Sequence, residues 1–454
     1  MNVAIIGTGY VGLTTGACLA YLGHQVTCVD AAERKIQALC EGEIPFHEPH
    51  LKDLVEDARH NLHFTTHYEK AIPQAQVVFI AVGTPPGVDG APDLQYLEAA
   101  AKGIGQNLSG EFTVVVNKST VPIGSGNWVG SIIRDAYEGR TGKKANGAFA
   151  VASNPEFLRE GSAILDSLYP DRVVVGSDQP RTAEVLFSLY RPLLDQDFPS
   201  PPYLPRPERM GAVALVTTDL ASAELIKYAA NAFLALKISY INEIGQLAEK
   251  VGADIQQVAK GIGLDARIGM RFLQAGIGWG GSCFGKDTAA LVSTASEYQL
   301  DSHIVKAARE VNRKQRDRVV EKLLGQLKIL KGRTVGILGL AFKPNTDDLR
   351  EAPAVDITRK LVERGARVRL HDPVAMKRFE LEYPEWASYC RATPEQVAED
   401  ADALILATEW LEYRSLDWEN ISSLMATPVV LDGRNALDRA RLTRAGFHYL
   451  TLAG

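Results

Sequence analysis

The first 23 residues read MNVAIIGTGYVGLTTGACLAYLG, and this stretch decides the fold of the N-terminal part of the chain. An apolar, β-branched run predicts a first strand, and Gly7, Gly9 and Gly12 follow it directly in the pattern G-x-G-x-x-G. The first glycine permits a tight turn, the second a close approach to a pyrophosphate, and the third helix-to-strand contact. Residues 14–23 then predict a helix, whose N-terminus would face the anion. The unit therefore predicts a dinucleotide site that includes Tyr10 and Val11.

Asp30 ends the next predicted strand, QVTCVD at residues 25–30. Its spacing from the glycines is that of a carboxylate that bonds a ribose diol, which favours a ligand site over a merely tight strand-to-helix turn. A carboxylate would repel a 2′-phosphate, so NAD is expected and not NADP. Lys35 weakens the preference for NAD over NADP, because a lysine could hold either ribose or phosphate.

Apolar runs with helical stretches between them recur in two parts of the chain. The first set lies at residues 3–7, 25–30, 77–85, 112–120 and 149–155, and the second at 333–343, 367–373, 403–410 and 428–435. Parallel strands need long crossovers and read as continuous apolar runs. The sequence therefore predicts an α/β protein with two Rossmann-like, doubly wound domains.

The middle of the chain has a different pattern. Residues 191–211, RPLLDQDFPSPPYLPRPERMG, are rich in proline, so they predict a boundary or surface insertion that no helix or central strand continues. Residues 219–250 contain no proline and are apolar on more than one face, which predicts a long helix buried between domains or subunits. We expect three parts: a dinucleotide-binding domain at 1–210, a central helical domain at 211–316, and a second Rossmann-like domain at 317–454.

Composition excludes several classes of partner. With 46% hydrophobic and 23% charged residues and a net charge of -6, the chain has no basic surplus for nucleic acid. Five scattered cysteines with no CxxC pair argue against a disulfide framework or a metal site, and favour the reducing cytoplasm. The N-terminal stretch lacks a basic leader, so we expect neither a signal peptide nor a membrane anchor.

Residues 276–287, GIGWGGSCFGKD, place one thiol, Cys283, in a glycine-rich run. Other candidate catalytic residues are Thr120 in NKSTVP, Glu156 and Glu160 in NPEFLREG, Lys227 and Asn231 in IKYAAN, and Asp287. The pairs 156/160, 227/231 and 283/287 are each four apart, which would put both members on one face if the backbone is helical. Taken alone, each charged residue could be a solvated surface group and Cys283 a buried small apolar residue.

Nine motifs decide between these readings: GTGYVG, VGTPP, KSTVP, NPEFLREG, IKYAANAFLALKISYINEI, GLDARIG, GIGWGGSCFGKD, GLAFKPNTDDLRE and DGRN. In this order, and over nearly the whole chain, the sequence resembles the UDP-glucose 6-dehydrogenase family, within the wider nucleotide-sugar 6-dehydrogenases. The resemblance implies two Rossmann-like domains joined by a long central helix, assembled as a homodimer or larger homo-oligomer. Residues 1–210 would bind NAD, residues 211–316 would form the dimerisation domain, and residues 317–454 would bind the UDP-sugar. It also implies oxidation of the sugar's C6 alcohol to a carboxylate with two equivalents of NAD.

The resemblance gives the candidate residues their roles. Cys283 is the nucleophile that forms a thiohemiacetal and then a thioester, since a free aldehyde is a poor hydride donor. Lys227 and Asn231 meet developing alkoxide charge. Thr120 and Asp287 match positions that order or activate water, and Glu156 matches a general acid/base. Glu160 matches a position near the nicotinamide. The loop glycines would let the sugar approach while nearby backbone N–H groups hold it.

The implied binding residues form two sets. For the cofactor they are Gly7, Gly9, Tyr10, Val11, Gly12, Asp30, Lys35, Thr84, Pro85, Ser119, Thr120, Glu160, Lys286 and Arg350. For the substrate they are Glu156, Phe157, Leu158, Arg159, Glu160, Lys227, Asn231, Arg267, Gly280, Lys343 and Arg434. The arginines suit phosphate because the planar guanidinium binds two oxygens at once, and some could come from a neighbouring subunit.

Several alternatives stay open. GDP-mannose and UDP-N-acetylsugar dehydrogenases share the thiol chemistry, although Phe284 after the cysteine and DARIG at 265–269 favour UDP-glucose. A one-step β-hydroxyacid dehydrogenase shares the N-terminal domain but needs no cysteine and no second α/β sheet. A non-catalytic nucleotide sensor gives no reason for Lys227, Asn231, Cys283 and Asp287 to occur together.

Overall fold

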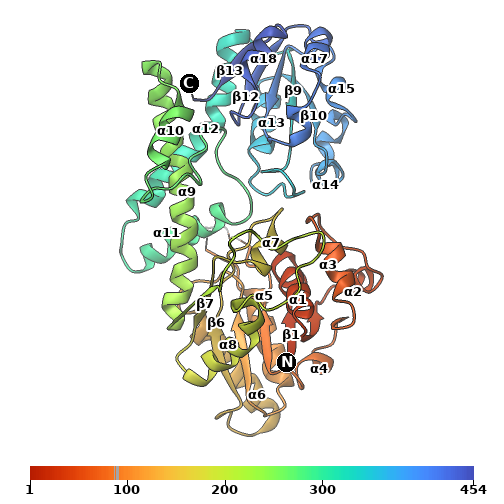
Figure 1. Cartoon of the computed structure of the whole chain (residues 1–454), viewed down its shortest axis with the longest axis vertical. Helices are drawn as coiled ribbons and strands as arrows, with labels where there is room; N and C mark the ends of the chain where they lie inside the picture. Colours follow the sequence, from red (N-terminus) through yellow and green to blue (C-terminus); the bar gives the residue numbers. More distant parts are fainter. Residues whose placement is uncertain (86, 88–90, 454) are drawn as a thin grey trace. The chain divides into compact units, whose positions relative to one another are not determined.

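The computed structural model describes residues 1–85, 87 and 91–453. Two compact units make up the chain: residues 1–229 with 289–294, and residues 230–288 with 295–454, of which residue 454 itself lies outside the described part. Figure 1 follows the chain from the N-terminal strands to the C-terminal ones. Each unit contains one sheet, as the two sets of apolar runs predict.

The first unit is built on an eight-stranded sheet of order β3-β2-β1-β4-β5-β6-β7-β8. Its strands are β1 (Asn2–Ile6), β2 (Gln25–Val29), β3 (Leu62–Thr65), β4 (Val77–Ile80), β5 (Thr113–Asn117), β6 (Phe149–Ser153), β7 (Arg172–Gly176) and β8 (Ala214–Thr218). Neighbours pair in parallel except β6 and β7, which are antiparallel. The five predicted strands are confirmed, whereas β3, β7 and β8 were not predicted.

Helices cover both faces of this sheet. They are α1 (Tyr10–Tyr21), α2 (Glu33–Cys40), α3 (Leu51–Asp57), α4 (Tyr68–Ala71), α5 (Gln95–Asn107), α6 (Ser125–Thr141), α7 (Ala163–Leu168) and α8 (Pro180–Leu194). Because side chains alternate along a strand, Val3 and Ile5 pack into one core with α1, while Ala4 and Ile6 pack into a second core with α5 and α6. Strands buried on both faces explain why their sequences are continuous apolar runs.

The proline-rich stretch lies within this unit and not at its border. Helix α8 continues through Pro192 to Leu194, so the expectation that no helix enters the stretch was wrong for its first residues. Beyond the stretch, β8 pairs with β7 from Arg172 opposite Ala214 to Gly176 opposite Thr218. The first sheet therefore extends past the boundary that we expected at residue 210, because a strand after the stretch completes its edge.

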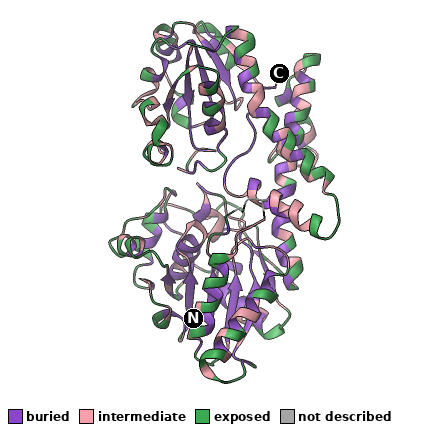
Figure 2. Cartoon of the chain, turned by 180° about the vertical axis from the view of Figure 1, so that it is seen from behind, coloured by how far each residue is buried: buried purple, intermediate pink, exposed green. Residues whose placement is uncertain are grey.

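The second unit has a five-stranded, fully parallel sheet of order β10-β9-β11-β12-β13. The strands are β9 (Thr334–Leu338), β10 (Arg367–His371), β11 (Ala403–Leu406), β12 (Val429–Asp432) and β13 (His448–Thr451), of which β13 was not predicted. Around it lie α13 (Pro353–Glu363), α14 (Met376–Glu382), the 3₁₀ helix Pro384–Tyr389, α15 (Pro394–Ala398), α16 (Leu411–Arg414), α17 (Trp418–Leu424) and α18 (Arg439–Arg444). Figure 2 shows the central strands of each sheet as buried, whereas the residues of the edge strands β8 and β13 are exposed or intermediate.

Four helices make up the central region: α9 (Leu220–Val251), α10 (Ile255–Gly263), α11 (Phe284–Glu297) and α12 (His303–Leu327). The long helix predicted at 219–250 is confirmed as α9, a single helix of 32 residues. The boundary expected between residues 316 and 317 falls inside α12. In the described chain, no helix combines the length and hydropathy that crossing a bilayer requires. The predicted fold class, two Rossmann-like domains with a helical middle region, is confirmed.

Candidate active site

The glycine turn after β1 has the geometry that a dinucleotide requires. Gly7 has φ +98°, and a Cβ there would lie 2.6 Å from the Ala81 carbonyl oxygen. At Gly12 a Cβ would lie 1.9 Å from the Gly7 oxygen, so a side chain would break the contact between helix and turn. At Gly9 a Cβ would meet no heavy atom within 4 Å, so this backbone is open to a ligand. Each glycine fits the purpose that its position in the motif predicts.

Asp30 lies just beyond the end of β2 and is tied back to the turn. Its Oδ2 accepts hydrogen bonds from the Thr8 backbone N–H at 2.9 Å, the Thr8 hydroxyl at 2.7 Å and the Lys35 ammonium at 2.9 Å. Burial acts to raise the pKa of Asp30, but these bonds and one from Ala32 outweigh it and lower the pKa to about 2. The carboxylate is therefore ionised, as acceptance of ribose hydroxyls requires, and Lys35 neutralises it.

The loops after β4 and β5 are joined to each other. The Thr84 hydroxyl donates to the Thr120 carbonyl oxygen at 2.9 Å, and the Ser119 hydroxyl donates to the Val82 oxygen at 2.8 Å. Strand order reverses between β1 and β4, and ligands of open α/β sheets bind at the carboxyl ends of strands at such a switch point. Thr84, Pro85, Ser119 and Thr120 therefore lie where the resemblance implies cofactor contacts.

Glu156 and Lys227 form a buried ion pair in the first unit. Lys227 Nζ donates to Glu156 Oε1 at 2.8 Å and to the Glu156 backbone oxygen at 2.7 Å. Only 5% of the Lys227 side chain and 7% of the Glu156 side chain are exposed. The other carboxylate oxygen of Glu156 accepts from the Leu158 N–H at 2.8 Å. Charges buried this deeply are rare unless they are paired, and they are frequent at sites of chemistry.

A second lysine, Lys118, accompanies this pair, and the sequence analysis missed it. Its ammonium donates to Asn154 Oδ1 at 2.9 Å, and the Tyr190 hydroxyl donates to the same oxygen at 2.6 Å. Burial lowers the pKa of Lys118 to about 8, with the charge of Lys227 lowering it further and that of Glu156 raising it. The signal that could have found it is its place in NKSTVP, directly after a buried strand.

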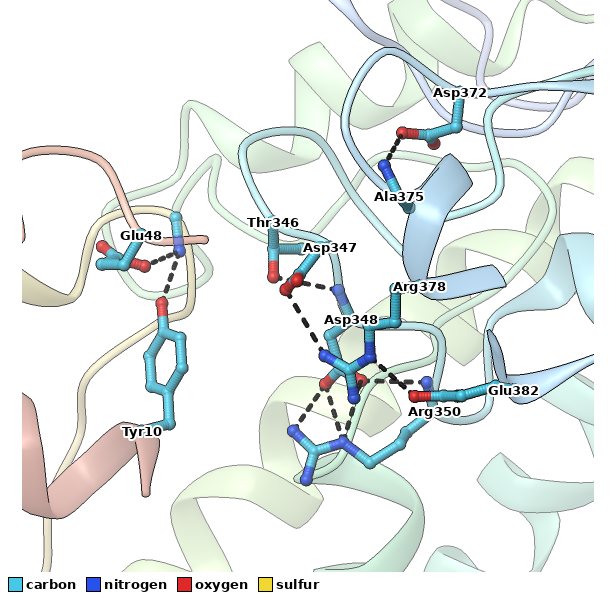
Figure 3. A network of polar contacts seen from close by, with 11 residues as sticks. Tyr10, Glu48, Thr346, Asp347, Asp348, Arg350, Asp372, Ala375, Arg378 and Glu382 are labelled. Carbon is cyan, nitrogen blue, oxygen red and sulfur yellow. Dashed lines mark hydrogen bonds and ion pairs between the residues drawn. The ribbon is translucent and has the colours of Figure 1, made fainter. Parts of the chain in front are cut away.

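The segment that carries Glu156 and Glu160 is not helical, so the two carboxylates do not share a helix face. Glu160 is 9% exposed, and the residue after it, Gly161, donates its N–H to Glu48 at 2.5 Å and to the Tyr10 hydroxyl at 2.9 Å. Figure 3 shows Tyr10 and Glu48 converging on this backbone nitrogen. Tyr10 thus uses its hydroxyl to fix the Glu160 segment.

Three substrate candidates border this segment. The Arg159 guanidinium binds Asp166 through two bonds, with Nη2 at 2.6 Å and Nε at 3.0 Å, so it is held by a protein carboxylate. The ring of Phe157 is covered by the Arg172 guanidinium at 3.6 Å. Leu158 supplies the backbone N–H that binds Glu156. Backbone and ring contacts thus fix the segment in one conformation.

Cys283 precedes the first residue of α11, and its half-buried thiol lies at the N-terminus of that helix. The Asp287 N–H donates to the Cys283 oxygen at 2.8 Å, which makes Cys283 the N-cap residue. The positive end of a helix dipole stabilises a thiolate, the nucleophilic form of cysteine. One turn along, Asp287 is 1% exposed and accepts from Asn231 Nδ2 at 2.6 Å. The nucleophile, the carboxylate and the amide are therefore connected within the second unit.

Lys286, adjacent to Asp287, has its Nζ 3.7 Å from Asp287 Oδ1. Its side chain is 20% exposed, so it retains access to solvent or ligand.

The helical spacing expected for 227/231 is confirmed on α9, where both residues belong to one continuous helix. For 283/287 the spacing corresponds to the first turn of α11.

The glycines of the cysteine loop contact the protein itself, and their expected role in letting the sugar approach stays a prediction. A Cβ on Gly278 would lie 2.4 Å from Asn312 Oδ1, and one on Gly280 would lie 2.4 Å from the Glu351 oxygen. A Cβ on Gly281 would lie 2.7 Å from the Phe342 ring. The loop is pressed against its support on three sides, so glycine is required by close packing.

Backbone N–H groups of this loop are also engaged. Those of Gly276, Ile277, Trp279 and Gly281 donate to Asn242 Oδ1 at 2.7 Å, Gly433 O at 2.6 Å, Asn312 Oδ1 at 2.7 Å and Arg350 O at 2.9 Å. These four groups hold the loop, and the expectation that nearby backbone N–H groups bind the sugar stays a prediction. Their hydrogen bonds hold the loop that carries Cys283 in a fixed position, and a catalytic group that is fixed in advance needs no rearrangement during the reaction.

The predicted cations differ in their surroundings. The guanidinium of Arg434 donates to the carbonyl oxygens of Ala407 at 2.7 Å, Gly278 at 3.0 Å and Phe342 at 2.9 Å, so it fixes the cysteine loop. Arg350 binds Asp348 with Nη2 at 2.7 Å and Nε at 2.8 Å (Figure 3). The guanidinium of Arg434 is thus held by three carbonyl oxygens, and its contact with the substrate stays a prediction.

Lys343 and Arg267 are more accessible. Lys343 is partly exposed, with its ammonium 5.4 Å from the centre of the Phe342 ring. The side chain of Arg267 is 89% exposed and pairs with Asp265 at 2.6 Å. An arginine this exposed is available to a neighbouring molecule, as the resemblance implies for some of these cations.

The second sheet begins with the same kind of turn as the first, but the carboxylate that follows its second strand, Asp372, is buried. Asp372 lies just beyond the end of β10 and accepts from Leu340 N–H at 2.7 Å and Ala341 N–H at 3.1 Å. The Trp410 indole N–H also donates to it at 3.1 Å, and Asp372 is 1% exposed. Figure 3 shows its further bond to Ala375 N–H. Asp372 is thus buried and bonded by the protein, so among the described residues the ribose-binding arrangement of an accessible carboxylate belongs to the first sheet.

Three family models match the chain in order. Residues 1–194 match the NAD binding domain, residues 221–314 the central domain, and residues 336–439 the UDP binding domain of the UDP-glucose/GDP-mannose dehydrogenase family. Together the three matches cover most of the chain.

Curated and solved proteins agree with these matches. The chain is 45% identical over 452 residues to UDP-glucose 6-dehydrogenase TuaD of Bacillus subtilis, covering 99% of this chain and 92% of that protein. It is 45% identical over 460 residues to UDP-glucose 6-dehydrogenase of Rhizobium meliloti, covering 100% and 99%. A UDP-glucose dehydrogenase structure from Pyrobaculum islandicum superposes with a TM-score of 0.88 at 38% identity, covering 100% and 97%. A GDP-mannose dehydrogenase structure from Pseudomonas aeruginosa is 29% identical with a TM-score of 0.53, covering 100% of both.

Proposed function

Because the chain belongs to the UDP-glucose/GDP-mannose dehydrogenase family, we propose that it oxidises the C6 alcohol of UDP-glucose to the carboxylate of UDP-glucuronate, with NAD as the oxidant. The observation that carries the chemistry is Cys283 at the N-terminus of α11, on a loop that Asn312 and Arg434 hold in place. Identity of 45% to UDP-glucose enzymes against 29% to a GDP-mannose enzyme supports the choice of sugar.

The residues that would hold NAD are the glycine turn, ionised Asp30, and the joined loops of Thr84 and Thr120. When bound, NAD accepts one hydride in each of the two oxidation steps. The first step also removes the hydroxyl proton of C6. We assign the negative charge that develops on this oxygen to the Lys227 ammonium and to a second N–H of the Asn231 amide. Lys227 and Asn231 lie four residues apart on α9, so one helix carries both groups.

The second oxidation begins on sulfur. The Cys283 Sγ bonds to C6 of the aldehyde, the thiol proton passes to the carbonyl oxygen, and a thiohemiacetal forms. Loss of its C–H hydride and O–H proton gives a thioester. Asp287, one turn from Cys283 and buried, is placed on the same helix to order water or hold a proton.

Hydrolysis completes the reaction. Water adds to the thioester carbon, the C–S bond breaks, and the Cys283 thiolate leaves with the carboxylic acid formed. We propose Glu156 as the general acid/base of this stage, because its Oε1 is hydrogen-bonded to Lys227. Thr120 is proposed to contribute to water ordering, and Glu160 to contact the nicotinamide end of the cofactor.

Purified protein with limiting UDP-glucose should form two molecules of NADH per sugar, because the conversion of an alcohol into an acid removes two hydrides. Absorbance at the NADH band, with the sugar product identified by mass spectrometry, measures this ratio. One NADH per sugar with aldehyde as the final product would exclude the thioester mechanism. Parallel assays with GDP-mannose and UDP-N-acetylsugars, compared by kcat/KM, test the assignment of substrate.

We also propose that the partner of this chain is a second copy of itself, bound through α9. Phe233, Tyr240 and Leu247 lie seven residues apart on this helix and are 61%, 51% and 59% exposed. Apolar residues at heptad spacing form a continuous stripe on a helix, and such stripes are covered by a partner helix. The long-helix dimer that the resemblance implies is consistent with this surface.

The double substitution Phe233→Glu with Leu247→Glu should halve the molar mass of the assembly, because two carboxylates would replace the apolar centre of the stripe. Multi-angle light scattering after size-exclusion chromatography measures it. Leu381→Glu is the control, since Leu381 is also an exposed leucine, at 75%, but lies on α14 and not on α9. Unchanged molar mass in the double variant would place the interface elsewhere.

A further inference from the structure

Lys118 is held inside the first unit by a fixed set of bonds. It is the residue after β5, two positions before Thr120. Its ammonium and the Tyr190 hydroxyl donate to the same oxygen, Asn154 Oδ1, at 2.9 and 2.6 Å. Asn154 in turn donates Nδ2 to the Val174 oxygen at 2.7 Å. A lysine that is anchored this way keeps its charge at one place, which a solvated lysine does not.

Lys118 lines a cavity together with Glu156, one member of the buried pair. A cavity of about 80 Å³ is lined by Lys118, Glu156 and further titratable groups, which are Cys18, Asp166, Arg172 and Tyr190. Burial raises the pKa of Cys18 to about 12 and raises that of Tyr190 as well, so both are neutral.

The remaining charged groups around the cavity are already matched. Asp166 is bound by Arg159 at 2.6 Å, and Arg172 covers the Phe157 ring. The ionised groups that interact with Lys118 are therefore Glu156, which attracts it, and Lys227, which repels it. Lys118 and Lys227 thus both interact with the carboxylate of Glu156, whose side chain is 7% exposed.

We propose that Lys118 is a positioning residue that acts through the Glu156–Lys227 pair: it draws charge from Glu156 and repels the Lys227 ammonium. A like charge nearby favours the neutral form of an amine. Lys118 therefore helps Lys227 to give up its proton. The neutral amine then takes the proton of the C6 alcohol and becomes the ammonium that meets the charge on that oxygen. The inference rests on the proposed function, and it assigns to Lys118 a share in setting the pH at which that function operates.

Lys118→Gln tests this, because the glutamine amide can still donate to Asn154 while the charge is lost. We expect the acidic limb of the kcat profile, where Lys227 must lose a proton, to move up by about one pH unit. Lys118→Arg keeps the charge and should keep the wild-type limb. Lys118→Met fills the same space without charge and should reproduce the shift of the glutamine variant. KM for UDP-glucose should stay within about twofold, since Lys118 does not contact substrate.

Each other result decides against the inference. An unshifted limb in the glutamine and methionine variants, or a uniform loss of kcat at every pH, would make Lys118 a structural residue. So would the failure of both uncharged variants to fold while Lys118→Arg folds. Absence of UDP-glucose oxidation in the wild-type chain would instead contradict the proposed function, so the two failures are distinguishable.

Discussion

Cys283→Ser should lose turnover to UDP-glucuronate by about 1,000-fold or more while still binding UDP-glucose. A serine hydroxyl is far less ionised than a thiol at neutral pH, and an ester is hydrolysed more slowly than a thioester. The side chain keeps nearly the same volume at the start of α11, so the loop should keep its conformation. Steady-state NADH formation measures the loss, and calorimetric titration with UDP-glucose measures the retained binding.

Cys390→Ser is the matched control for this experiment. Cys390 is also a partly exposed thiol, but burial raises its pKa to about 11, so it is a poor nucleophile at neutral pH. Its replacement should leave turnover unchanged. Wild-type turnover in Cys283→Ser would show that Cys283 only fills the turn. Loss of UDP-glucose binding together with turnover would show that the substitution disturbed the loop itself.

Local pattern was sufficient for the parts of the fold that are buried on both faces. The runs at β1, β4, β5, β9 and β12 are continuous and apolar because helices cover them on two sides, and periodicity detects this directly. It missed the edge strands β3, β8 and β13, and also the internal strand β7, whose apolar run RVVVG carries the signal. In β8, which pairs only with β7, most side chains are at least partly exposed, so ALVTT carries little of the apolar signal.

In the candidate site, too, sequence patterns identified some residues and missed others. Residues whose role depends on chemical type, such as Asp30 after its strand, could be found from spacing. The roles of Gly278 and Arg434 could not, because each is decided by a contact with residues far along the chain. Lys118 was missed for the same reason: a lysine in a loop is usually solvated, and only the folded structure places Asn154 against it.

Lys227→Met should lower kcat by about 100- to 1,000-fold, because it removes the cation that meets the developing charge on the C6 oxygen. It should also lower the free energy of unfolding, by about 3–5 kcal/mol, since Glu156 would stay buried without its ion-pair partner. The kinetic and thermodynamic effects have different causes and can be separated. Lys237→Met is the control on the same helix, since Lys237 donates only to the backbone oxygens of Ile268 and Gly269.

The double variant Glu156→Gln with Lys227→Met separates the two effects. Neutral glutamine needs no counter-charge, so the free energy of unfolding, measured by urea titration, should recover most of the loss. The kcat should stay low, because no ammonium returns to the site. Recovery of both quantities together would mean that Lys227 supports turnover only by holding the fold. Recovery of stability alone would show that the loss of kcat has a chemical cause and does not come from a disturbed fold, and the same measurement on Lys237→Met should change neither quantity appreciably.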